Sequence, residues 1–251
     1  MVNDNDSHLQ CKASIDRHLQ RGILRSMDSA TLDLQSLYDA LLRAYGPQNW
    51  WAGRDDPFEV IVGAILTQRT TWTNAGRAIE ALRRANLLTP EAIRQTENCE
   101  LEILIRPTGF YRAKTAKLKA FCTMLRTEYD DDLSRLLALP MEDLRLVLLS
   151  VYGIGDETAD AILLYAAGKP SFVIDAYTRR VLTRLGWIEG RESYQQLRKA
   201  FTKALPMDVE TFAEYHALIV RHGKIHCRSR PRCKTCPLAN TCETAKHPEE
   251  I

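Results

Sequence analysis

The chain has 251 residues, of which 45% are apolar and 26% are charged, and its formal net charge is only +2. This length and composition allow one large hydrophobic core or two smaller ones, as in an ordinary globular protein. No run of 18 apolar residues is present and the N-terminal MVNDNDSHLQ lacks the pattern of a signal peptide, which excludes the membrane-spanning and secreted classes. We therefore expect a soluble protein in a reducing compartment.

The first elements in the chain are a tail and two helices. Residues 1–27 are polar and weakly periodic, so we predict a disordered tail, with Met27 as an alternative start. Apolar side chains at helical spacing predict a helix over residues 34–45 that ends at a Gly-Pro pair. The next helix begins at Pro57 with Asp56 as its cap, and its apolar sequence indicates that it is largely buried. Further helices are predicted after Thr89, over 110–129, after Pro140 and after Asp208.

Strands are not expected. The best apolar run outside a helix, residues 172–174, is too short to build a sheet, and few segments alternate in the manner of a strand. No repeat with a period of 20 to 50 residues is present, which excludes a solenoid. The predicted fold class is all-α.

Four cysteines close to the C-terminus have the spacing C-x5-C-x2-C-x5-C. They are Cys227, Cys233, Cys236 and Cys242. Four thiolates within sixteen residues predict a metal site. A structural zinc usually takes two short cysteine pairs separated by a longer stretch, so this compact spacing favours a 4Fe-4S cluster, with zinc and disulfides as alternatives.

The segment around these cysteines is strongly basic. Residues 221–236 contain six lysines and arginines and no acidic residue, although the whole chain carries a net charge of only +2. A local patch of this kind favours contacts with the phosphates of DNA, and a solvated face is the alternative. The candidate DNA-binding residues here are Arg228, Arg230, Arg232 and Lys234.

A second candidate site lies in the sequence LLSVYGIGDETADAILLYA at residues 148–166. Two apolar helices are joined there by Gly153-Ile154-Gly155. A turn without β-carbons allows backbone amides to approach a phosphate, and the N-terminus of the following helix adds partial positive charge. Asp175 follows twenty residues after Gly155, in the segment VIDAYTRR.

The hairpin G-I-G-D-E-T-A-D, the V-I-D-A-Y segment and the cysteine loop together resemble the helix-hairpin-helix DNA glycosylases of the endonuclease III superfamily. The segments WWAGRDDPFEVIVGAILTQRT, IRPTGFYRAKTAKLKAF and HGKI are similar to its 3-methyladenine glycosylase branch. The resemblance covers about residues 30–242 and implies a two-lobed fold. A six-helix barrel domain would span 57–169, with the hairpin at 148–166, and an iron–sulfur cluster domain would combine 28–56 with 170–245.

The same resemblance implies partners and a location. Double-stranded DNA containing a damaged base would bind across the cleft, and abasic-site processing enzymes would take over the product. We expect a monomer in the cytoplasm, associated with the nucleoid.

Three departures from the family pattern narrow the expected activity. Bifunctional members have a lysine at the position of Glu157, and a carboxylate cannot form the Schiff base that cuts the strand. Adenine-excising relatives have a glutamate acid where this chain has Ala64. The first cysteine gap is five residues instead of the usual six, so the type of cluster can differ.

Asp175 is the remaining catalytic candidate. A single carboxylate that stabilises an oxocarbenium-like sugar requires a base that already leaves easily, which an N-alkylated purine with a positive charge does. We therefore expect a monofunctional glycosylase for 3-methyladenine-like bases. The alternatives are an endonuclease III-like glycosylase for oxidised pyrimidines and a non-catalytic DNA-binding protein. Asp175 can equally be a helix N-cap, and the two roles are compatible.

The other candidates surround the flipped base. Trp50, Trp51 and Trp72 can stack on a cationic base, although a tryptophan is more often part of a core. Lys224 in H-G-K either reaches the base pocket or contacts a phosphate.

The resemblance also implies residues that fill the space in the duplex. Gln68 would take the place of the flipped base and Phe110 would enter the opposite strand, with an exposed helix end and a core position as the alternatives. Arg179 and Arg180 are expected to face phosphates or solvent, and the histidines to have surface or packing roles.

Overall fold

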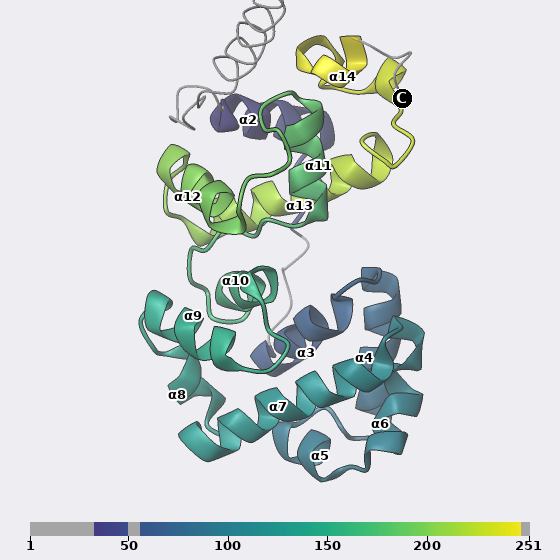
Figure 1. Cartoon of the computed structure of the whole chain (residues 1–251), viewed down its shortest axis with the longest axis vertical. Coiled ribbons are helices and arrows are strands. Elements are labelled where there is room, and N and C mark those ends of the chain that lie inside the picture. The colour runs from purple at the N-terminus through teal and green to yellow at the C-terminus, as the bar shows by residue number, and fades with distance from the viewer. Residues whose placement is uncertain (1–32, 50–55, 247–251) are drawn as a thin grey trace, which may run out of the picture. The chain divides into compact units, whose positions relative to one another are not determined.

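The computed structural model describes residues 33–49 and 56–246. In these ranges the chain is helical without a strand, so the all-α class is confirmed (Figure 1). The predicted tail, Trp50 and Trp51 lie outside the described residues. No helix in the described part combines the length and the apolar character needed to cross a membrane.

The elements are the α-helices α2 Leu34–Tyr45, α3 Pro57–Thr67, α4 Trp72–Arg84, α5 Pro90–Gln95, α6 Asn98–Ile105, α7 Tyr111–Tyr129, α8 Leu133–Leu137, α9 Met141–Ser150, α10 Asp156–Tyr165, α11 Ala176–Arg184, α12 Tyr194–Ala204, α13 Val209–Ile225 and α14 Glu243–Lys246, with the short 3-10 helices η1 Arg106–Thr108, η2 Cys233–Thr235 and η3 Ala239–Thr241.

The predicted helix starts agree with the structure. The side chains of Asp56, Thr89 and Asp208 each accept a hydrogen bond from a backbone N–H in the first turn of α3, α5 and α13. α7 begins one residue later than predicted, because Phe110 has left-handed backbone torsions (φ 46°) and precedes the helix.

One core forms around α3. Its buried side chains come from both sides of the helix and pack against α4, α7 and α10 (Figure 1). Burying one large apolar side chain, such as a leucine or a phenylalanine, contributes about 1.5–3 kcal/mol to the stability of the fold. The largest fully buried side chains here include Ile61, Ile65, Leu66, Leu82 and Phe121.

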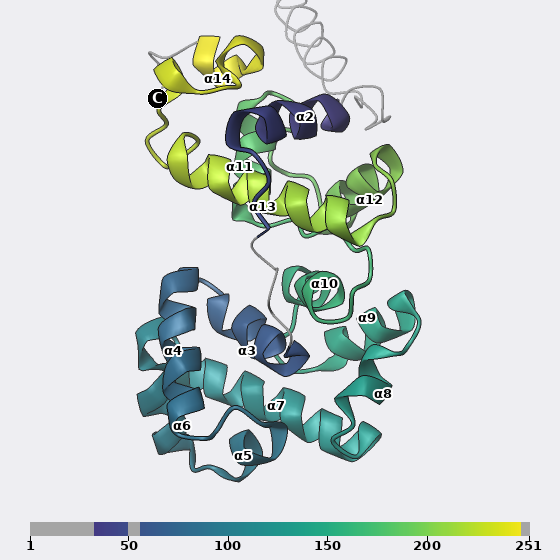
Figure 2. The same ribbon diagram turned by 180° about the vertical axis from the view of Figure 1, so that it is seen from behind.

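A second core brings together helices from far apart in the sequence. α2 packs against α13, as the view from behind shows (Figure 2). Phe172 stacks on Phe201 with ring centroids 3.8 Å apart and meets Phe212 edge to face at 5.4 Å. The hydroxyl of Tyr215 donates to the carbonyl of Leu34 over 2.8 Å, which fixes α2 on α13.

A buried ionic network holds the hairpin helices. Arg145 on α9 donates to Asp160 on α10 from Nε (2.9 Å) and Nη2 (3.2 Å), and Asp160 is completely buried. Ser171 donates to the same carboxylate (2.7 Å) and accepts from Nε of Arg198 on α12 (3.0 Å). The hairpin is therefore fixed to α12 by satisfied charges.

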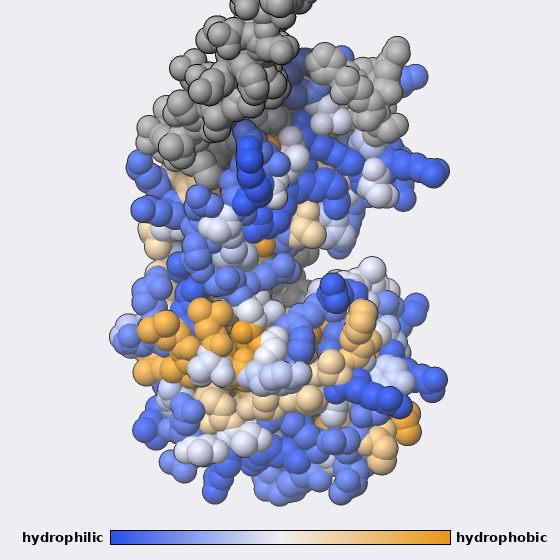
Figure 3. Space-filling view, in the orientation of Figure 1, coloured by the Kyte–Doolittle hydropathy of each residue, from blue (hydrophilic) through white to orange (hydrophobic). Residues whose placement is uncertain are grey.

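The surface is mostly hydrophilic on the side shown in Figure 3. Apolar residues gather over the part that carries α8 and α9, where Leu146 is 67% exposed. The same view is hollowed between the part that carries α11 and α13 and the part that carries α3 and α4.

Candidate active site and DNA-binding face

A pocket of ≈ 210 Å³ lies where α3, α4, α10, α11 and α13 meet. It brings Asp175, Trp72, Lys224 and Gln68 of the predicted site residues together. Ala64 and Glu157, the two positions that depart from the family pattern, line it as well. The other lining residues are Val60, Thr67, Thr70, Thr71, Thr158, Ala161, Tyr165, Val173, Tyr177, His216 and Val220.

Asp175 is both the N-cap of α11 and a pocket residue. Its Oδ1 accepts hydrogen bonds from the backbone N–H (2.7 Å) and the hydroxyl (2.9 Å) of Thr178. Burial raises the pKa of this carboxyl, but the interactions with His216 and Thr178 outweigh that effect and lower its pKa below the usual value. Asp175 is therefore held ionised with one oxygen oriented by the helix terminus.

His216 is a site residue that the sequence did not reveal. Its Nε2 lies 3.5 Å from Oδ2 of Asp175, and its Nδ1 lies 2.6 Å from the hydroxyl of Tyr165. His216, Val220 and Lys224 follow one another at four-residue intervals along α13 and all line the pocket. That spacing places three residues on one helix face, which is the signal that could have identified His216.

Glu157 stands in the first turn of α10 and adds a second carboxylate to the pocket. Its pKa is raised by desolvation and then by the nearby charge of Asp175. Two carboxyl groups of one pocket thus have pKa values displaced in opposite directions, an arrangement that separates the roles of two acids at one site.

Trp72 and Tyr177 supply two of the aromatic surfaces of the pocket. Trp72 is 38% exposed at the start of α4, and its ring packs so closely on α3 that a β-carbon at Gly63 would lie 2.9 Å from Cη2. Tyr177 packs in the same manner on Gly223 of α13. Glycine at these two positions allows the rings to lie against the helices.

Gln68 and Phe110 differ in their surroundings: the Gln68 side chain is half-buried against the hairpin, whereas the Phe110 side chain is exposed. Gln68 donates from Nε2 to the carbonyl of Gly153 (3.0 Å) and to the hydroxyl of Thr158 (2.9 Å), and it accepts from Lys117. Phe110 is 64% exposed, so it is not part of the core. The alternative reading of Phe110 as a core residue is wrong.

The two hairpin glycines have different structural roles. Gly153 has φ +81°, and a β-carbon there would collide with the side chain of Lys117. Gly155 has no heavy atom near its β-carbon position and is exposed before the first turn of α10. Ile154 between them is 5% exposed and anchors the turn in the core. The open position at Gly155 leaves the first amides of α10 accessible to an anion.

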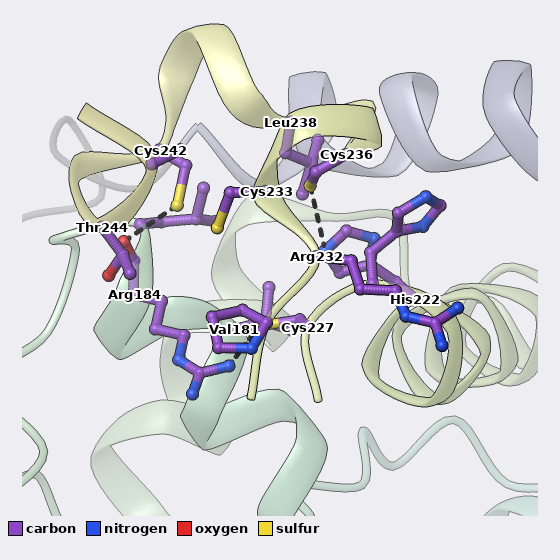
Figure 4. Close-up of a pocket in the computed structure, with 14 residues that line it drawn as sticks. Val181, Arg184, His222, Cys227, Arg232, Cys233, Cys236, Leu238, Cys242 and Thr244 are labelled. Carbon is purple, nitrogen blue, oxygen red and sulfur yellow. Dashed lines mark hydrogen bonds between the residues drawn. The ribbon is translucent and has the colours of Figure 1, made fainter. Parts of the chain in front are cut away.

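The four cysteines line one small pocket next to α11 and α13 (Figure 4). Arg184 donates from Nη1 to Sγ of Cys227 (3.4 Å), and Nε2 of His222 lies 3.9 Å from Sγ of Cys236. Burial raises the pKa of the Cys236 and Cys242 thiols. Within residues 33–49 and 56–246, no three His, Cys, Asp or Glu side chains are close enough to hold a single metal ion.

Comparison with known proteins identifies the family. The model of the HhH-GPD superfamily of base excision DNA repair proteins matches residues 62–207, more than half of the chain. The chain belongs to the HhH-GPD superfamily. A protein of Methanocaldococcus jannaschii that carries the name of a DNA repair glycosylase is 43% identical over 212 residues, which cover 83% of this chain and 95% of that protein.

Solved structures of other proteins support the assignment of this chain to the HhH-GPD superfamily. A non-covalent complex of endonuclease III with DNA matches with a TM-score of 0.75 at 25% identity and covers 88% of this chain and 100% of that one. The Helicobacter pylori 3-methyladenine DNA glycosylase bound to 1,N6-ethenoadenine matches with a TM-score of 0.67 at 28% identity, covering 77% and 98%. The resemblance to the endonuclease III superfamily is confirmed.

In the HhH-GPD protein, the part of the basic segment 221–236 that follows α13, called the basic loop, is held by two arginine side chains of α11. Arg184 donates to the carbonyls of Arg228 (2.5 Å) and Ser229 (3.0 Å), and Arg180 donates to the carbonyl of Cys227 (2.7 Å) while its guanidinium lies 4.9 Å from the ring of Tyr177. The side chains of Arg228, Arg230, Arg232 and Lys234 are exposed.

The structure differs in part from the prediction that Arg179 and Arg180 face phosphates or solvent, because both side chains are half-buried and bind backbone carbonyls. Arg179 donates to the carbonyl of Glu192 (2.8 Å), and both Cys227 and Gly223 accept hydrogen bonds from Arg180. Sequence alone does not distinguish an arginine that binds backbone carbonyls of a distant loop from one that faces solvent.

Proposed function

We propose that this HhH-GPD protein is a monofunctional DNA glycosylase that hydrolyses the N-glycosidic bond of N-alkylated purines such as 3-methyladenine in duplex DNA. The observation that carries the proposal is the position of Asp175, whose carboxyl pKa is lowered, in a pocket that also contains a second carboxyl group and three aromatic rings of tryptophan and tyrosine. The product is an abasic site in an unbroken strand. Abasic-site processing enzymes would then act on it, and the protein would work as a monomer in the cytoplasm at the nucleoid.

The chemistry assigned to Asp175 follows from its charge and its orientation. The carboxylate stabilises positive charge that develops on the deoxyribose as the base departs, and it positions the water that attacks C1′. Thr178 occupies Oδ1, whereas His216 lies on the side of Oδ2. The contact with the Tyr165 hydroxyl fixes the orientation of the His216 imidazole. Because His216 in turn lies beside Asp175, the carboxylate is held in place before the reaction begins.

The substrate class follows from what the pocket offers to the base. Ala64 supplies no proton donor at the position where adenine-excising relatives have a glutamate, so a base must leave without that assistance. An N3-alkylated adenine carries a positive charge and departs readily. Trp72 and Tyr177 favour such a cation by contact with their ring faces, and the carboxylate of Glu157 attracts it.

The absence of strand cleavage is part of the proposal. Glu157 occupies the hairpin position at which bifunctional relatives have the lysine that forms an imine, and a carboxylate cannot replace it. Lys224 also lines the pocket and is the amine to be tested for such chemistry.

DNA binding is assigned to the hairpin turn, to two side chains that would enter the duplex, and to the exposed basic side chains that follow α13. Gly153-Ile154-Gly155 would bind a phosphate through backbone amides, Gln68 would fill the place of the flipped base, and Phe110 would enter the opposite strand. The exposed loop side chains would contact further phosphates; these are Arg228, Arg230, Arg232 and Lys234. Trp50 and Trp51, outside the described residues, stay candidates for the base pocket.

A 4Fe-4S cluster is the proposed cofactor of the four-cysteine pocket. The donor set fits it, because four cysteine side chains of one loop surround one pocket and the Arg184 guanidinium approaches Sγ of Cys227. Cys227, Cys233, Cys236 and Cys242 would hold it as thiolates. The bound cluster would supply a rigid cross-link for the basic loop in an iron–sulfur domain beside the six-helix barrel. Iron and sulfide analysis with an absorption spectrum tests this assignment.

The decisive experiment measures release of 3-methyladenine from methylated duplex DNA. Asp175→Asn should lower the single-turnover rate by at least about 100-fold and leave duplex affinity nearly unchanged. Asp208→Asn is the matched control, because Asp208 caps α13 with the same 2.7 Å hydrogen bond to a threonine amide and is exposed, away from the pocket-lining residues. Equal rates for wild type and Asp175→Asn would overturn the assignment.

A second candidate is an endonuclease III-like glycosylase for oxidised pyrimidines, which the likeness to the endonuclease III complex favours. Duplexes with one oxidised pyrimidine or one alkylated purine each separate the two activities. Borohydride trapping adds a test of lyase chemistry, since a covalent adduct lost in Lys224→Met would identify Lys224 as the amine. Tight, salt-sensitive binding without an abasic product from any duplex would instead indicate a non-catalytic DNA-binding protein.

A further inference from the structure

Phe110, one of the residues proposed to enter DNA, shares an uncommon backbone conformation with Arg69, the exposed neighbour of Gln68. Arg69 (φ 55°) follows α3, and Phe110 (φ 46°) precedes α7. Side chains with a β-carbon seldom adopt this left-handed region, because the β-carbon then lies too close to a backbone carbonyl oxygen. Such residues persist where the surrounding structure imposes them, and they are concentrated at functional sites.

The two residues contact each other. The guanidinium carbon of Arg69 lies 5.7 Å from the centroid of the Phe110 ring, within the range of a cation–π interaction. Phe110 is 64% exposed and Arg69 is exposed, so the pair stands on the surface and is not supported by a core. The unusual backbone torsions thus direct two side chains from different loops toward one point.

A buried lysine joins the segments on which the pair stands. Nζ of Lys114 donates to the carbonyl of Leu66 at the end of α3 (2.9 Å) and to the carbonyl of Thr108 in η1 (2.8 Å). These acceptors lie three residues before Arg69 and two before Phe110. Lys114 is only 2% exposed, so this link is rigid and leaves the relative position of the two loops fixed.

We propose that Arg69 and Phe110 act together as one wedge, in which Arg69 donates hydrogen bonds to the base that loses its partner when the lesion is flipped. This inference rests on the proposed function, because it takes the DNA-inserting role of Phe110 as given. The planar guanidinium has five N–H donors and no acceptor. Thymine, the partner of a methylated adenine, presents acceptor oxygens to such a group.

The competing role for Arg69 is an ordinary phosphate contact. A phosphate contact depends on charge and weakens binding to all duplexes alike when it is removed. A wedge depends on the flat shape of the guanidinium, acts only where a base pair is open, and requires Phe110. Charge-preserving and double substitutions therefore separate the two roles.

The test uses the full chain and a duplex with a tetrahydrofuran abasic-site analogue opposite 2-aminopurine, whose fluorescence reports unstacking. Arg69→Ala and Arg69→Lys should both reduce the fluorescence change on binding and lower the preference for this duplex over an undamaged one by about ten-fold. Adding Arg69→Ala to Phe110→Ala should produce little further loss, because the two residues act as one unit.

Arg135→Ala is the matched control, because Arg135 on α8 also lies 5.7 Å from an aromatic ring, that of Tyr129, away from the pocket-lining residues. It should behave as wild type. Arg69→Gly removes the left-handed strain and should melt no lower than Arg69→Ala while losing the same preference, which separates function from folding.

Two results would overturn the wedge. Full recovery by Arg69→Lys, or equal weakening of damaged and undamaged duplexes by Arg69→Ala with a salt slope reduced by about one, would assign Arg69 to a phosphate. Release of 3-methyladenine by the wild-type protein is measured in a separate assay. Failure of the proposed function would appear in that assay, whatever the result for the Arg69 variants.

Discussion

The ring of Tyr177 lies directly against Gly223, where a β-carbon would be only 2.3 Å from Cδ1 of the ring. This contact joins the first turn of α11, which carries Asp175, to the helix that carries His216 and Lys224. Arg180 strengthens the junction, because it stacks on Tyr177 and donates to the carbonyl of Gly223. The glycine in H-G-K therefore shapes the wall of the pocket.

Gly223→Ala should displace Tyr177 from the pocket wall. Because overpacking at a tight contact costs typically 1–3 kcal/mol, the free energy of unfolding should fall by about that amount and the KM for 3-methyladenine in duplex DNA should rise. Urea unfolding and steady-state kinetics measure both. Gly76→Ala on α4 is the control, since no heavy atom lies within 4 Å of its β-carbon position, and it should be neutral or stabilising. A normal KM for Gly223→Ala would contradict this role.

Glu157→Gln should change the pH dependence of excision. The pKa of Glu157 is raised by desolvation and by Asp175, so its negative charge appears only as the pH rises through that higher value. Attraction of a cationic base should strengthen over the same interval, and kcat/KM for 3-methyladenine should increase with pH there. The variant should lack this rise and have a lower kcat/KM at neutral pH. Identical profiles for the two proteins would exclude an electrostatic role for Glu157.

Asp160→Asn should destabilise the hairpin. The substitution leaves the buried Arg145 guanidinium without its main counter-charge, and breaking a buried pair by changing one partner costs about 3–5 kcal/mol. Chemical unfolding measures the loss. Glu80→Gln is the control, because Glu80 forms exposed pairs with Arg83 and Arg84, and the variant should leave the free energy of unfolding nearly unchanged.

Lys114→Met should alter stability in alkaline solution. Burial, together with repulsion from Lys117, lowers the pKa of Lys114 from 10.5 to about 8. A folded-state pKa below the unfolded value means that the charged amine is disfavoured on folding. This penalty is complete below about pH 8 and disappears as the pH rises from about 8 to 10.5.

The wild type should therefore gain stability relative to Lys114→Met across that interval, by at most about 3 kcal/mol. Melting temperatures at several pH values measure the difference. Lys203→Met, at an exposed position on α12, should follow the wild type throughout. A constant difference between wild type and Lys114→Met would show that the Lys114 amine does not titrate in this range.

Much of the helical framework could be predicted from local signals. Asp56, Thr89 and Asp208 start helices in the structure as their sequences indicated, because capping depends on neighbouring residues alone. Asp175 could be identified as a candidate from its position in the sequence, twenty residues after Gly155. In the structure it is the N-cap of α11, as expected. Gln68 and Trp72 reach the same pocket from the α3–α4 connection.

The contacts between distant segments could not be predicted. His216 meets Asp175 and Tyr165 only because α13 packs beside α10 and α11, and the sequence separation hides that relation. Arg180 and Arg184 bind backbone carbonyls, which have no sequence signature. The left-handed torsions of Arg69 and Phe110 are equally hidden, since neither residue type favours that conformation.

Arg180 and Arg184 bind the cysteine loop through its carbonyl oxygens and one sulfur, and not through its basic side chains. The backbone conformation of the loop therefore does not depend on the number of basic side chains that the loop carries. In the proposed complex with DNA, each basic side chain of this loop could consequently be replaced to change the affinity for DNA while the fold and the proposed catalytic pocket stay unchanged.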